Sequence, residues 1–173
     1  MGSEQRTVTM KGNPLPLSGT PVSVGDKAPD FTVVDNGLAP VKLSSFLGKV
    51  LVVSAVPSLD TPVCDRETRR FNEEADKLGD DVAVLTVSMD LPFAQKRWCG
   101  AAGITRVITL SDHRSAEFGN AYGVLLENLR LLARAVFVID RTGVVQQIEI
   151  VPEVTDEPDY DRVLAAVKAQ LGR

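Results

Sequence analysis

Residues 50–56 read Val-Leu-Val-Val-Ser-Ala-Val, a short run in which nearly every side chain is apolar and most are β-branched. Such a run is typical of a strand covered on both faces, as in a parallel sheet. Residues 82–88 repeat the pattern with Val-Ala-Val-Leu-Thr-Val-Ser. Residues 64–78, between the two runs, carry apolar side chains at helical spacing, namely Phe71, Ala75 and Leu78. The three segments predict a parallel strand–helix–strand unit.

The rest of the chain extends this unit in both directions. Towards the C-terminus we expect a helix that starts near residues 90–92 and ends at Gly100 or Gly103, then a strand at 107–110 and a helix at 114–122. Strands at 135–140 and 144–150 and a helix at 160–171 follow. Near the N-terminus, residues 8–17 predict a hairpin. The prediction is one α/β domain over residues 19–173, with a mixed central sheet flanked by helices. An N-terminal hairpin extension over residues 1–18 precedes it.

Composition excludes several classes of protein. With 173 residues, 44% hydrophobic and 24% charged, the chain has the make-up of an average soluble domain rather than a disordered or collagen-like sequence. A net charge of −4 offers no basic surface for nucleic acid, and the 5% aromatic content leaves little for base stacking. No apolar run approaches the roughly 20 residues of a membrane helix, and residues 1–12 lack the apolar core of a signal peptide. We therefore expect a cytoplasmic protein with neither nucleic acid nor membrane as partner.

The chain holds two cysteines, Cys64 and Cys99, although a protein of this size needs no disulfide to fold. In a cytoplasmic protein such a pair is normally reduced, metal-bound or redox-active. A structural zinc site needs four ligands, and the chain adds only His113, which lies in a polar run and is expected at the surface or at a helix start. Glycine-rich nucleotide motifs are also absent from the sequence. We expect neither a metal nor another cofactor.

Cys64 follows the first of these strands, at the start of a helix. Thr61 is a favourable N-cap and Pro62 takes the first helical position, which places Cys64 third in the helix. A side chain there faces unpaired backbone N–H groups and the positive end of the helix dipole, so the thiolate is favoured. Free cysteines are more often small, inert, buried residues. The position beyond the carboxyl end of a strand, where sites of α/β sheets lie, favours a nucleophile over that alternative.

Charged residues near these positions are less informative. Those that follow Cys64 alternate in sign: Asp65, Arg66, Glu67, Arg69 and Arg70. Such mixed charges are typical of a solvated helix face, which is what we expect here. By its pattern alone, Arg134 at the start of an apolar strand is an ordinary charged edge residue.

Pro57, Thr61 and Cys64 have the spacing P-x-x-x-T-x-x-C, which resembles the active-site motif of the peroxiredoxin family. Further segments resemble one branch of that family, the bacterial thiol peroxidases. These segments are residues 11–14, 90–97, 99–100, 121–124, 133–135 and 157–160. Because they are spread from residue 11 to residue 160, the resemblance covers nearly the whole chain.

The resemblance implies a thioredoxin-like fold in which Cys64 attacks the terminal oxygen of a peroxide and becomes a sulfenic acid. It further implies that Pro57 shields the site from water and that the Thr61 hydroxyl hydrogen-bonds the thiolate and the peroxide. Arg134 would stabilise the thiolate and orient the peroxide. The substrates would be hydrogen peroxide and organic hydroperoxides, with the organic ones favoured.

Cys99 lies near the end of a predicted helix, too far along the chain from Cys64 for a C-x-x-C motif. From the residues alone it is either a thiol that condenses with a nearby sulfenic acid or a packing residue beside Trp98. The resemblance implies the first, with Cys99 forming an intramolecular disulfide with Cys64. Because the Cα atoms of bonded cysteines lie within about 7 Å, we expect local unwinding on oxidation, with Gly100 and Gly103 as one hinge.

The resemblance also implies partners. A thioredoxin-like dithiol donor would reduce the disulfide, and the protein would be a homodimer with its active-site loops near the interface. The chain departs from the family pattern over residues 125–132, Leu-Leu-Glu-Asn-Leu-Arg-Leu-Leu. This segment is either a wall of the site beside Arg134 or, as an exposed leucine cluster, part of a subunit contact.

Three functions are compatible with these features. A peroxidase would consume peroxide catalytically when a reductant is present. A redox sensor or binding module would use the same Cys64–Cys99 switch without efficient turnover. A structural thioredoxin-like domain would carry inert cysteines that react slowly with peroxide. The resemblance favours the first function.

Overall fold

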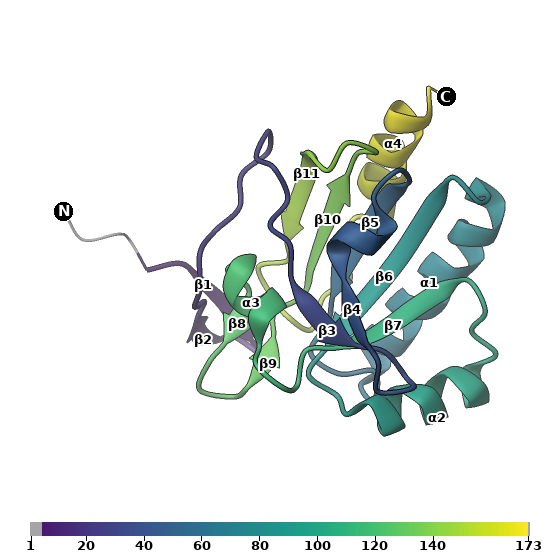
Figure 1. Ribbon diagram of the computed structural model, residues 1–173. Helices are drawn as coiled ribbons and strands as arrows, with labels where there is room; N and C mark the ends of the chain where they lie inside the picture. Colours follow the sequence, from purple (N-terminus) through teal and green to yellow (C-terminus); the bar gives the residue numbers. More distant parts are fainter. Residues whose placement is uncertain (1–4, 173) are drawn as a thin grey trace.

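The computed structural model describes residues 5–172 and has a seven-stranded sheet at its centre (Figure 1). The strand order is β11-β10-β5-β6-β7-β3-β4. These strands are β3 (Thr32–Val34), β4 (Pro40–Lys42), β5 (Val50–Ala55), β6 (Val82–Ser88), β7 (Val107–Ser111), β10 (Ala135–Ile139) and β11 (Val145–Ile150). Strands β5, β6 and β7 run parallel to one another, and the other neighbouring pairs are antiparallel. The predicted mixed sheet is confirmed.

Strand β5 is an interior strand, third in the order of seven, and is buried along its whole length. It pairs in parallel with β6 from Val50↔Val82 to Ala55↔Val87, and it pairs antiparallel with β10 on its other side. The predicted strand–helix–strand unit is therefore confirmed. The carboxyl end of β5 leads directly into the loop that precedes Cys64.

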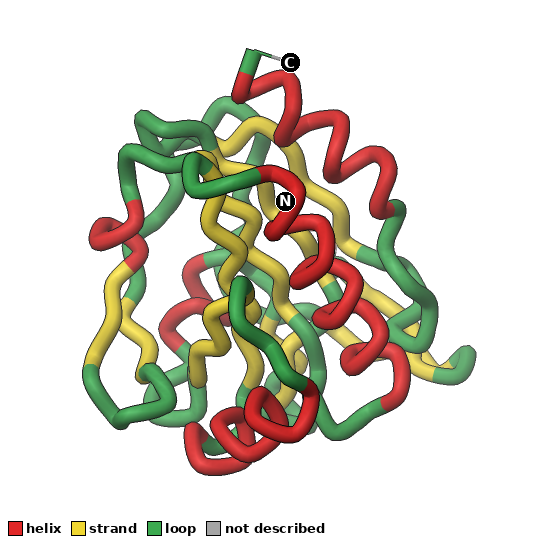
Figure 2. The backbone as a smooth tube through the Cα atoms, turned by 90° about the vertical axis from the view of Figure 1, so that its right-hand side faces the viewer, coloured by secondary structure: helices red, strands yellow, loops and turns green. Residues whose placement is uncertain are grey.

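Helices cover both faces of the sheet. Within residues 5–172 they are η1 (Leu43–Phe46), α1 (Pro62–Leu78), α2 (Pro92–Ala102), α3 (Glu117–Ala121) and α4 (Tyr160–Leu171). Helices α1 and α4 lie side by side on one face (Figure 2), and the buried side chains predicted for them share one apolar cluster. The other face is covered by α3 and its neighbouring loops around four packed rings, those of Phe31, Phe118, Tyr122 and Phe137. None of the helices in this part of the chain has the length and apolar character needed to cross a membrane.

The helix predicted at 114–122 is shorter than expected, because α3 begins only at Glu117. Ala116, just before it, has a φ of 50°, in the left-handed region. The buried carboxylate of Asp112 accepts the backbone N–H groups of Phe118 at 3.1 Å and Gly119 at 2.9 Å. The N–H groups of the first turn of a helix have no partner within it, so the Asp112 carboxylate caps α3 where it begins.

The predicted N-terminal hairpin is confirmed, with strands β1 (Thr7–Met10) and β2 (Asn13–Pro16). Lys11 and Gly12 form its turn, both with positive φ. Backbone hydrogen bonds join Thr9 to Pro152 and to Val154, both at 2.8 Å, so the hairpin is fixed to the main domain. The predicted extension over residues 1–18 begins with four residues that lie outside the described ones, and its boundary at residue 18 stays a prediction.

The leucine-rich segment at 125–132 forms a further hairpin, with strands β8 (Leu125–Leu126) and β9 (Leu131–Leu132). Leu125, Leu126 and Leu132 are buried in the core on the α3 side of the sheet, and Leu129 at the turn is 44% exposed. The expectation of an exposed leucine cluster is therefore wrong. The segment instead fills the core of its own chain, as apolar side chains do when a buried surface is available.

Candidate active site

Helix α1 begins as predicted, with Thr61 as N-cap residue and Pro62 in the first helical position, so Cys64 is third. The side chain of Thr61, however, does not cap the helix, because its hydroxyl donates to the carbonyl of Ser58 at 2.9 Å. Cys64 is fully buried in a small apolar cluster that also contains Trp98. The expected position of the Cys64 thiol at the helix start is confirmed. The Thr61 hydroxyl, expected to hydrogen-bond this thiol, donates to Ser58 in this structure.

Arg134 brings a cation to Cys64. Its Nη2 lies 3.2 Å from Sγ of Cys64, its Nη1 lies 2.6 Å from Oε2 of Glu67, and its Nε donates to the carbonyl of Val154 at 2.9 Å. The side chain is 2% exposed. The reading of Arg134 as an ordinary edge residue is therefore wrong, and the juxtaposition with Cys64 implied by the family resemblance is present.

Glu67 completes this buried group and was not predicted as a site residue. It is fully buried and accepts a hydrogen bond from Ser54 at 2.9 Å, on its other oxygen. Burial raises the pKa of Glu67 above its ordinary value, while Arg134 and Ser54 pull it down. The expectation of a solvated face is wrong for this residue. Helical spacing could have predicted its burial. Glu67 falls three residues after Cys64 and four before Phe71, on the buried face of α1.

A mainly apolar cavity of about 260 Å³ opens beside Arg134. It is lined by Met10, Lys11, Pro57, Thr61, Pro62, Val63, Arg134, Val154 and Thr155. Three of the predicted site residues, Pro57, Thr61 and Arg134, thus meet at one cavity. Cys64 does not line it but contacts Arg134, which does. Residues 125–132 are not part of the lining, so the cavity does not support their expected role as a wall of the site.

The loop between β5 and α1 is held by Asp90, two residues after the end of β6. Its Oδ1 accepts from the hydroxyl of Ser58 at 2.6 Å, and its Oδ2 accepts from the backbone N–H of Leu59 at 2.9 Å. The hydroxyl of Ser88 donates to Oδ2 as well, at 2.7 Å. These charge-assisted bonds fix the loop that carries Pro57.

Cys99 lies in the last turn of α2 and is half-buried. It packs against the apolar cluster that contains Cys64, and both cysteines are free thiols in the structure. Its neighbour Trp98 donates from Nε1 to the carboxylate of Asp65 on α1 at 2.8 Å. The two cysteine-bearing helices are therefore joined in the reduced protein. The predicted disulfide, and the unwinding expected with it, stay predictions.

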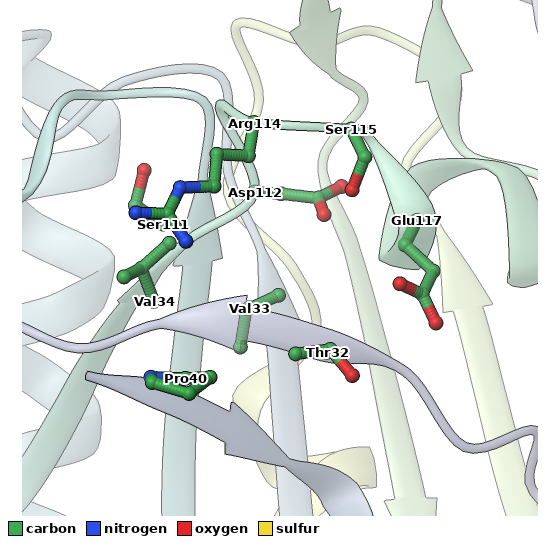
Figure 3. Close-up of a pocket in the computed structure, with 9 residues that line it drawn as sticks. All are labelled: Thr32, Val33, Val34, Pro40, Ser111, Asp112, Arg114, Ser115 and Glu117. Atoms are coloured by element: carbon green, nitrogen blue, oxygen red, sulfur yellow. The ribbon is translucent and has the colours of Figure 1, made fainter. Parts of the chain in front are cut away.

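A separate pocket lies above strands β3 and β4, near one edge of the sheet (Figure 3). Figure 3 shows Asp112 and Arg114 on the loop after β7, and Glu117 at the start of α3. Burial raises the pKa of Asp112 to about 6, although hydrogen bonds from the backbone N–H groups of Gly119 and Phe118 act to lower it. Because the carboxylate is engaged in holding the start of α3, we assign it to the fold.

A metal site is not formed by the described part of the chain. Among residues 5–172, no three His, Cys, Asp or Glu side chains are grouped so as to hold a metal ion. His113 is half-buried in the turn after β7, ahead of α3. The candidate site is therefore the Cys64–Arg134–Glu67 group with its cavity.

Comparison with known proteins places this geometry in a family. The family model described as Redoxin matches residues 23–164. The chain belongs to the Redoxin family. It is 59% identical to the thiol peroxidase of Halalkalibacterium halodurans, over 95% of this chain and 99% of that protein. It is 57% identical to the thiol peroxidase of Bacillus subtilis, over 94% of this chain and 96% of the relative.

Solved structures agree with this assignment. The peroxiredoxin-like protein from Aquifex aeolicus superimposes with a TM-score of 0.89 and 45% identity, covering 98% of this chain and 99% of that one. The thiol peroxidase from Chromobacterium violaceum shares the fold, with a TM-score of 0.85 at 24% identity. The resemblance to the peroxiredoxins of the thiol peroxidase branch is confirmed, as is the thioredoxin-like fold. The protein is accordingly an enzyme of this family, a peroxidase that requires a peroxide and a thiol reductant.

Proposed function

We propose that this protein reduces hydroperoxides with Cys64 as the nucleophile. The observation that carries the proposal is the 3.2 Å contact between Nη2 of Arg134 and Sγ of Cys64, next to a cavity that Arg134 itself lines. A guanidinium at this distance favours the thiolate, and the start of α1 adds the positive end of a helix dipole. Both effects act in a buried site, where they are stronger than in water.

In the proposed reaction the Cys64 thiolate attacks the terminal oxygen of the hydroperoxide. A sulfur–oxygen bond forms and the oxygen–oxygen bond breaks, so the remaining oxygen leaves as an alkoxide, or as hydroxide from hydrogen peroxide. It then takes up from solvent the proton that the Cys64 thiol released on ionising, and becomes an alcohol or water. Cys64 becomes a sulfenic acid. Arg134 is placed to stabilise negative charge on the sulfur and on the departing oxygen, because it joins Cys64 to the cavity.

Pro57 and Thr61 shape the entry to this reaction. Pro57 is buried and lines the cavity, where it would keep water from the thiolate. Thr61 also lines the cavity, and with its proton directed to Ser58 its oxygen is free to accept a hydrogen bond from a hydroperoxide. The apolar lining from Met10, Val63 and Val154 supports organic hydroperoxides as substrates beside hydrogen peroxide.

Cys99 would resolve the sulfenic acid as an intramolecular disulfide with Cys64. Support comes from the shared apolar cluster and from the two glycines around the end of α2, Gly100 within the helix and Gly103 as its left-handed C-cap. Glycine within a helix, as at Gly100, lowers helix stability and favours unwinding, whereas Gly103 in its left-handed conformation marks where the helix ends. A thioredoxin-like dithiol would then reduce the disulfide, with no bound cofactor.

A homodimer in the cytoplasm completes the proposal. Leu91 and Phe93, at the start of α2, are 54% and 67% exposed. Apolar side chains of this size at the surface are typical of contact sites, and they follow Asp90, which holds the active-site loop. Analytical ultracentrifugation of the chain and of a Phe93→Glu variant measures this association; a monomeric parent chain would contradict the dimer.

The test of the proposed function is a coupled peroxidase assay with thioredoxin, its reductase and NADPH. The natural chain is expected to consume hydroperoxide with matching NADPH oxidation, and Cys64→Ser to fall to the rate of the protein-free blank. Cys99→Ser is expected to lose turnover with thioredoxin after its first reaction with peroxide. Retained turnover in Cys64→Ser would overturn the nucleophile, and normal turnover in Cys99→Ser would overturn the resolving step.

A further inference from the structure

Cys99 has a defined hydrogen-bond partner that the proposed reaction does not use. Its Sγ lies 3.3 Å from Oγ1 of Thr109, on strand β7. Thr109 is 3% exposed, and its hydroxyl donates to Oδ1 of Asn36 at 3.0 Å. All three residues line a surface cavity, so Cys99 is reachable from solvent at this place.

Asn36 is held firmly in the turn between β3 and β4. Its neighbour Asp35 organises the turn, because one carboxylate oxygen accepts the backbone N–H groups of Gly37 at 2.8 Å and Ala39 at 3.0 Å. A backbone hydrogen bond from Asp35 to the carbonyl of Ala39, at 2.9 Å, closes it. The backbone that carries Asn36 is therefore held in place, and its amide oxygen accepts from Thr109.

The direction of these hydrogen bonds follows from the number of protons. A hydroxyl group has one proton, and Thr109 gives it to Asn36. Towards Cys99 the Thr109 oxygen can only accept, so the thiol must keep its proton and donate it. A thiolate at this position would face an oxygen lone pair in place of a donor. Because disulfide formation requires the thiolate, docked Cys99 is held in its less reactive form.

We propose that Thr109, oriented by Asn36, is a positioning residue that holds Cys99 as a docked, protonated thiol until Cys64 has been oxidised. The proposal rests on the resolving role of Cys99 proposed above. When the end of α2 unwinds, the Cys99 sulfur leaves Thr109 and attacks the sulfur of the Cys64 sulfenic acid. A sulfur–sulfur bond forms and the sulfur–oxygen bond breaks, and the Cys99 proton leaves with the hydroxyl group as water.

In this proposal Cys99 is accessible from solvent but unreactive while α2 is docked. The thiol lines a surface cavity that peroxides and small thiols can enter, yet its proton is engaged while α2 is docked. Release of α2 removes the acceptor and frees the sulfur at the time it is needed. Thr109 and Asn36 would therefore set how fast Cys99 competes with a second peroxide for the Cys64 sulfenic acid.

The test measures alkylation of Cys99 by iodoacetamide across a range of pH in full-length Cys64→Ser protein, where Cys99 is the remaining thiol. Asn36→Ala frees the Thr109 hydroxyl to turn and donate to the sulfur. We expect Cys99 to react on the order of 3- to 10-fold faster near neutral pH, the effect of one hydrogen bond. In a Thr109→Val background the same Asn36→Ala change should have no effect, and in a Thr109→Ser background the increase should return.

The double-variant design separates positioning from loosened packing. General loosening of the turn would speed alkylation equally with and without the Thr109 hydroxyl, and that result would overturn the proposal. An unchanged rate in Asn36→Ala would overturn it as well. Since this assay uses no peroxide, it stands apart from the resolving role, which is followed by disulfide formation in the protein with both cysteines. There, Asn36→Ala is expected to lower the sulfinic acid yield at Cys64, and an unchanged or higher yield would contradict the proposal.

Discussion

The two cysteines lie in one apolar cluster yet have opposite surroundings. Cys64 is fully buried and contacts a cation, Arg134, that is itself paired with a buried carboxylate. Cys99 is half-buried and contacts a neutral hydroxyl, that of Thr109. A buried cation stabilises the ionised form of a thiol, whereas an oxygen acceptor stabilises the protonated form. In the proposed mechanism, the partner of each cysteine, rather than its exposure, sets its reactivity.

The largest expected effect comes from removing the cation. In Arg134→Met, Glu67 remains buried without its partner, so the free energy of unfolding should fall by about 3–5 kcal/mol. Peroxidase kcat/KM should fall at least about 100-fold, since an electrostatic contact to the reacting atoms is lost. Urea unfolding and the coupled assay measure the two effects. Arg130→Met, at the exposed turn of the β8–β9 hairpin, is the control and should change neither; equal activity of the two variants would remove Arg134 from the site.

Asp112 is a buried carboxylate that accepts from backbone N–H groups, whereas Glu67 is paired with Arg134. It therefore shows the effect of burial without an ion pair. The pKa of Asp112 is raised by burial to about 6, above its value in the unfolded chain. The folded state therefore gains stability as pH falls from about 7 to about 4, by about 3 kcal/mol from this group. Urea unfolding of the natural chain and of Asp112→Asn measures it. The free-energy difference should shift in favour of the natural chain towards acid pH, and a constant difference would contradict the shift.

Glu67→Gln tests the carboxylate beside Arg134 with a smaller change. Glutamine keeps the size of the side chain and an acceptor for Arg134 but loses the charge. The free energy of unfolding should fall by about 1–2 kcal/mol, the difference between a charged and a neutral hydrogen bond in a buried place. Glu73→Gln, on the exposed face of the same helix, is the matched control. Equal stability of both variants would mean that the ion pair adds nothing to the fold.

The smallest effect is expected at Asp65 on α1, which accepts a hydrogen bond from Trp98 on α2 and so joins the two helices that carry the cysteines. Its pKa is lowered, first by its hydrogen bond with Arg69, and also by Trp98. The stability it contributes is therefore present at neutral pH and is lost as pH falls below about 4. For Asp65→Asn we expect a loss below about 1 kcal/mol at neutral pH that vanishes in acid. Trp98, the sole tryptophan of the chain, reports unfolding by fluorescence; a loss that persists in acid would contradict the charge effect.

Much of the fold follows from local sequence patterns. The runs at 50–56 and 82–88 are apolar on both sides because both faces of β5 and β6 are covered, and the stripe of α4 matches its buried side chains. Strands β3 and β4 have three residues each and lie at an edge, too short for a periodic signal.

The sequence predicts the position of Cys64 in the candidate site, but not the partners of Glu67 and Cys99. The position of Cys64 depends on the loop and helix start beside it, so local rules predict it. The ion pair of Glu67 depends on Arg134, 67 positions away, and the hydrogen bond of Cys99 depends on Thr109 on strand β7. Patterns of charge along α1 cannot report a partner that only the sheet brings near. The family motif marked Arg134, but its contact with Glu67 emerged from the three-dimensional arrangement.

The most direct test of the division between the two cysteines is the intact mass of the protein after one equivalent of hydroperoxide, with dimedone present to trap sulfenic acid. The natural chain is expected to lose two hydrogens as Cys64 and Cys99 pair, and Cys99→Ser is expected to carry one dimedone adduct, on Cys64. Dimedone on Cys99, or a natural chain whose Cys99 stays alkylatable while Cys64 is oxidised, would contradict the assignment of attacking and resolving thiols.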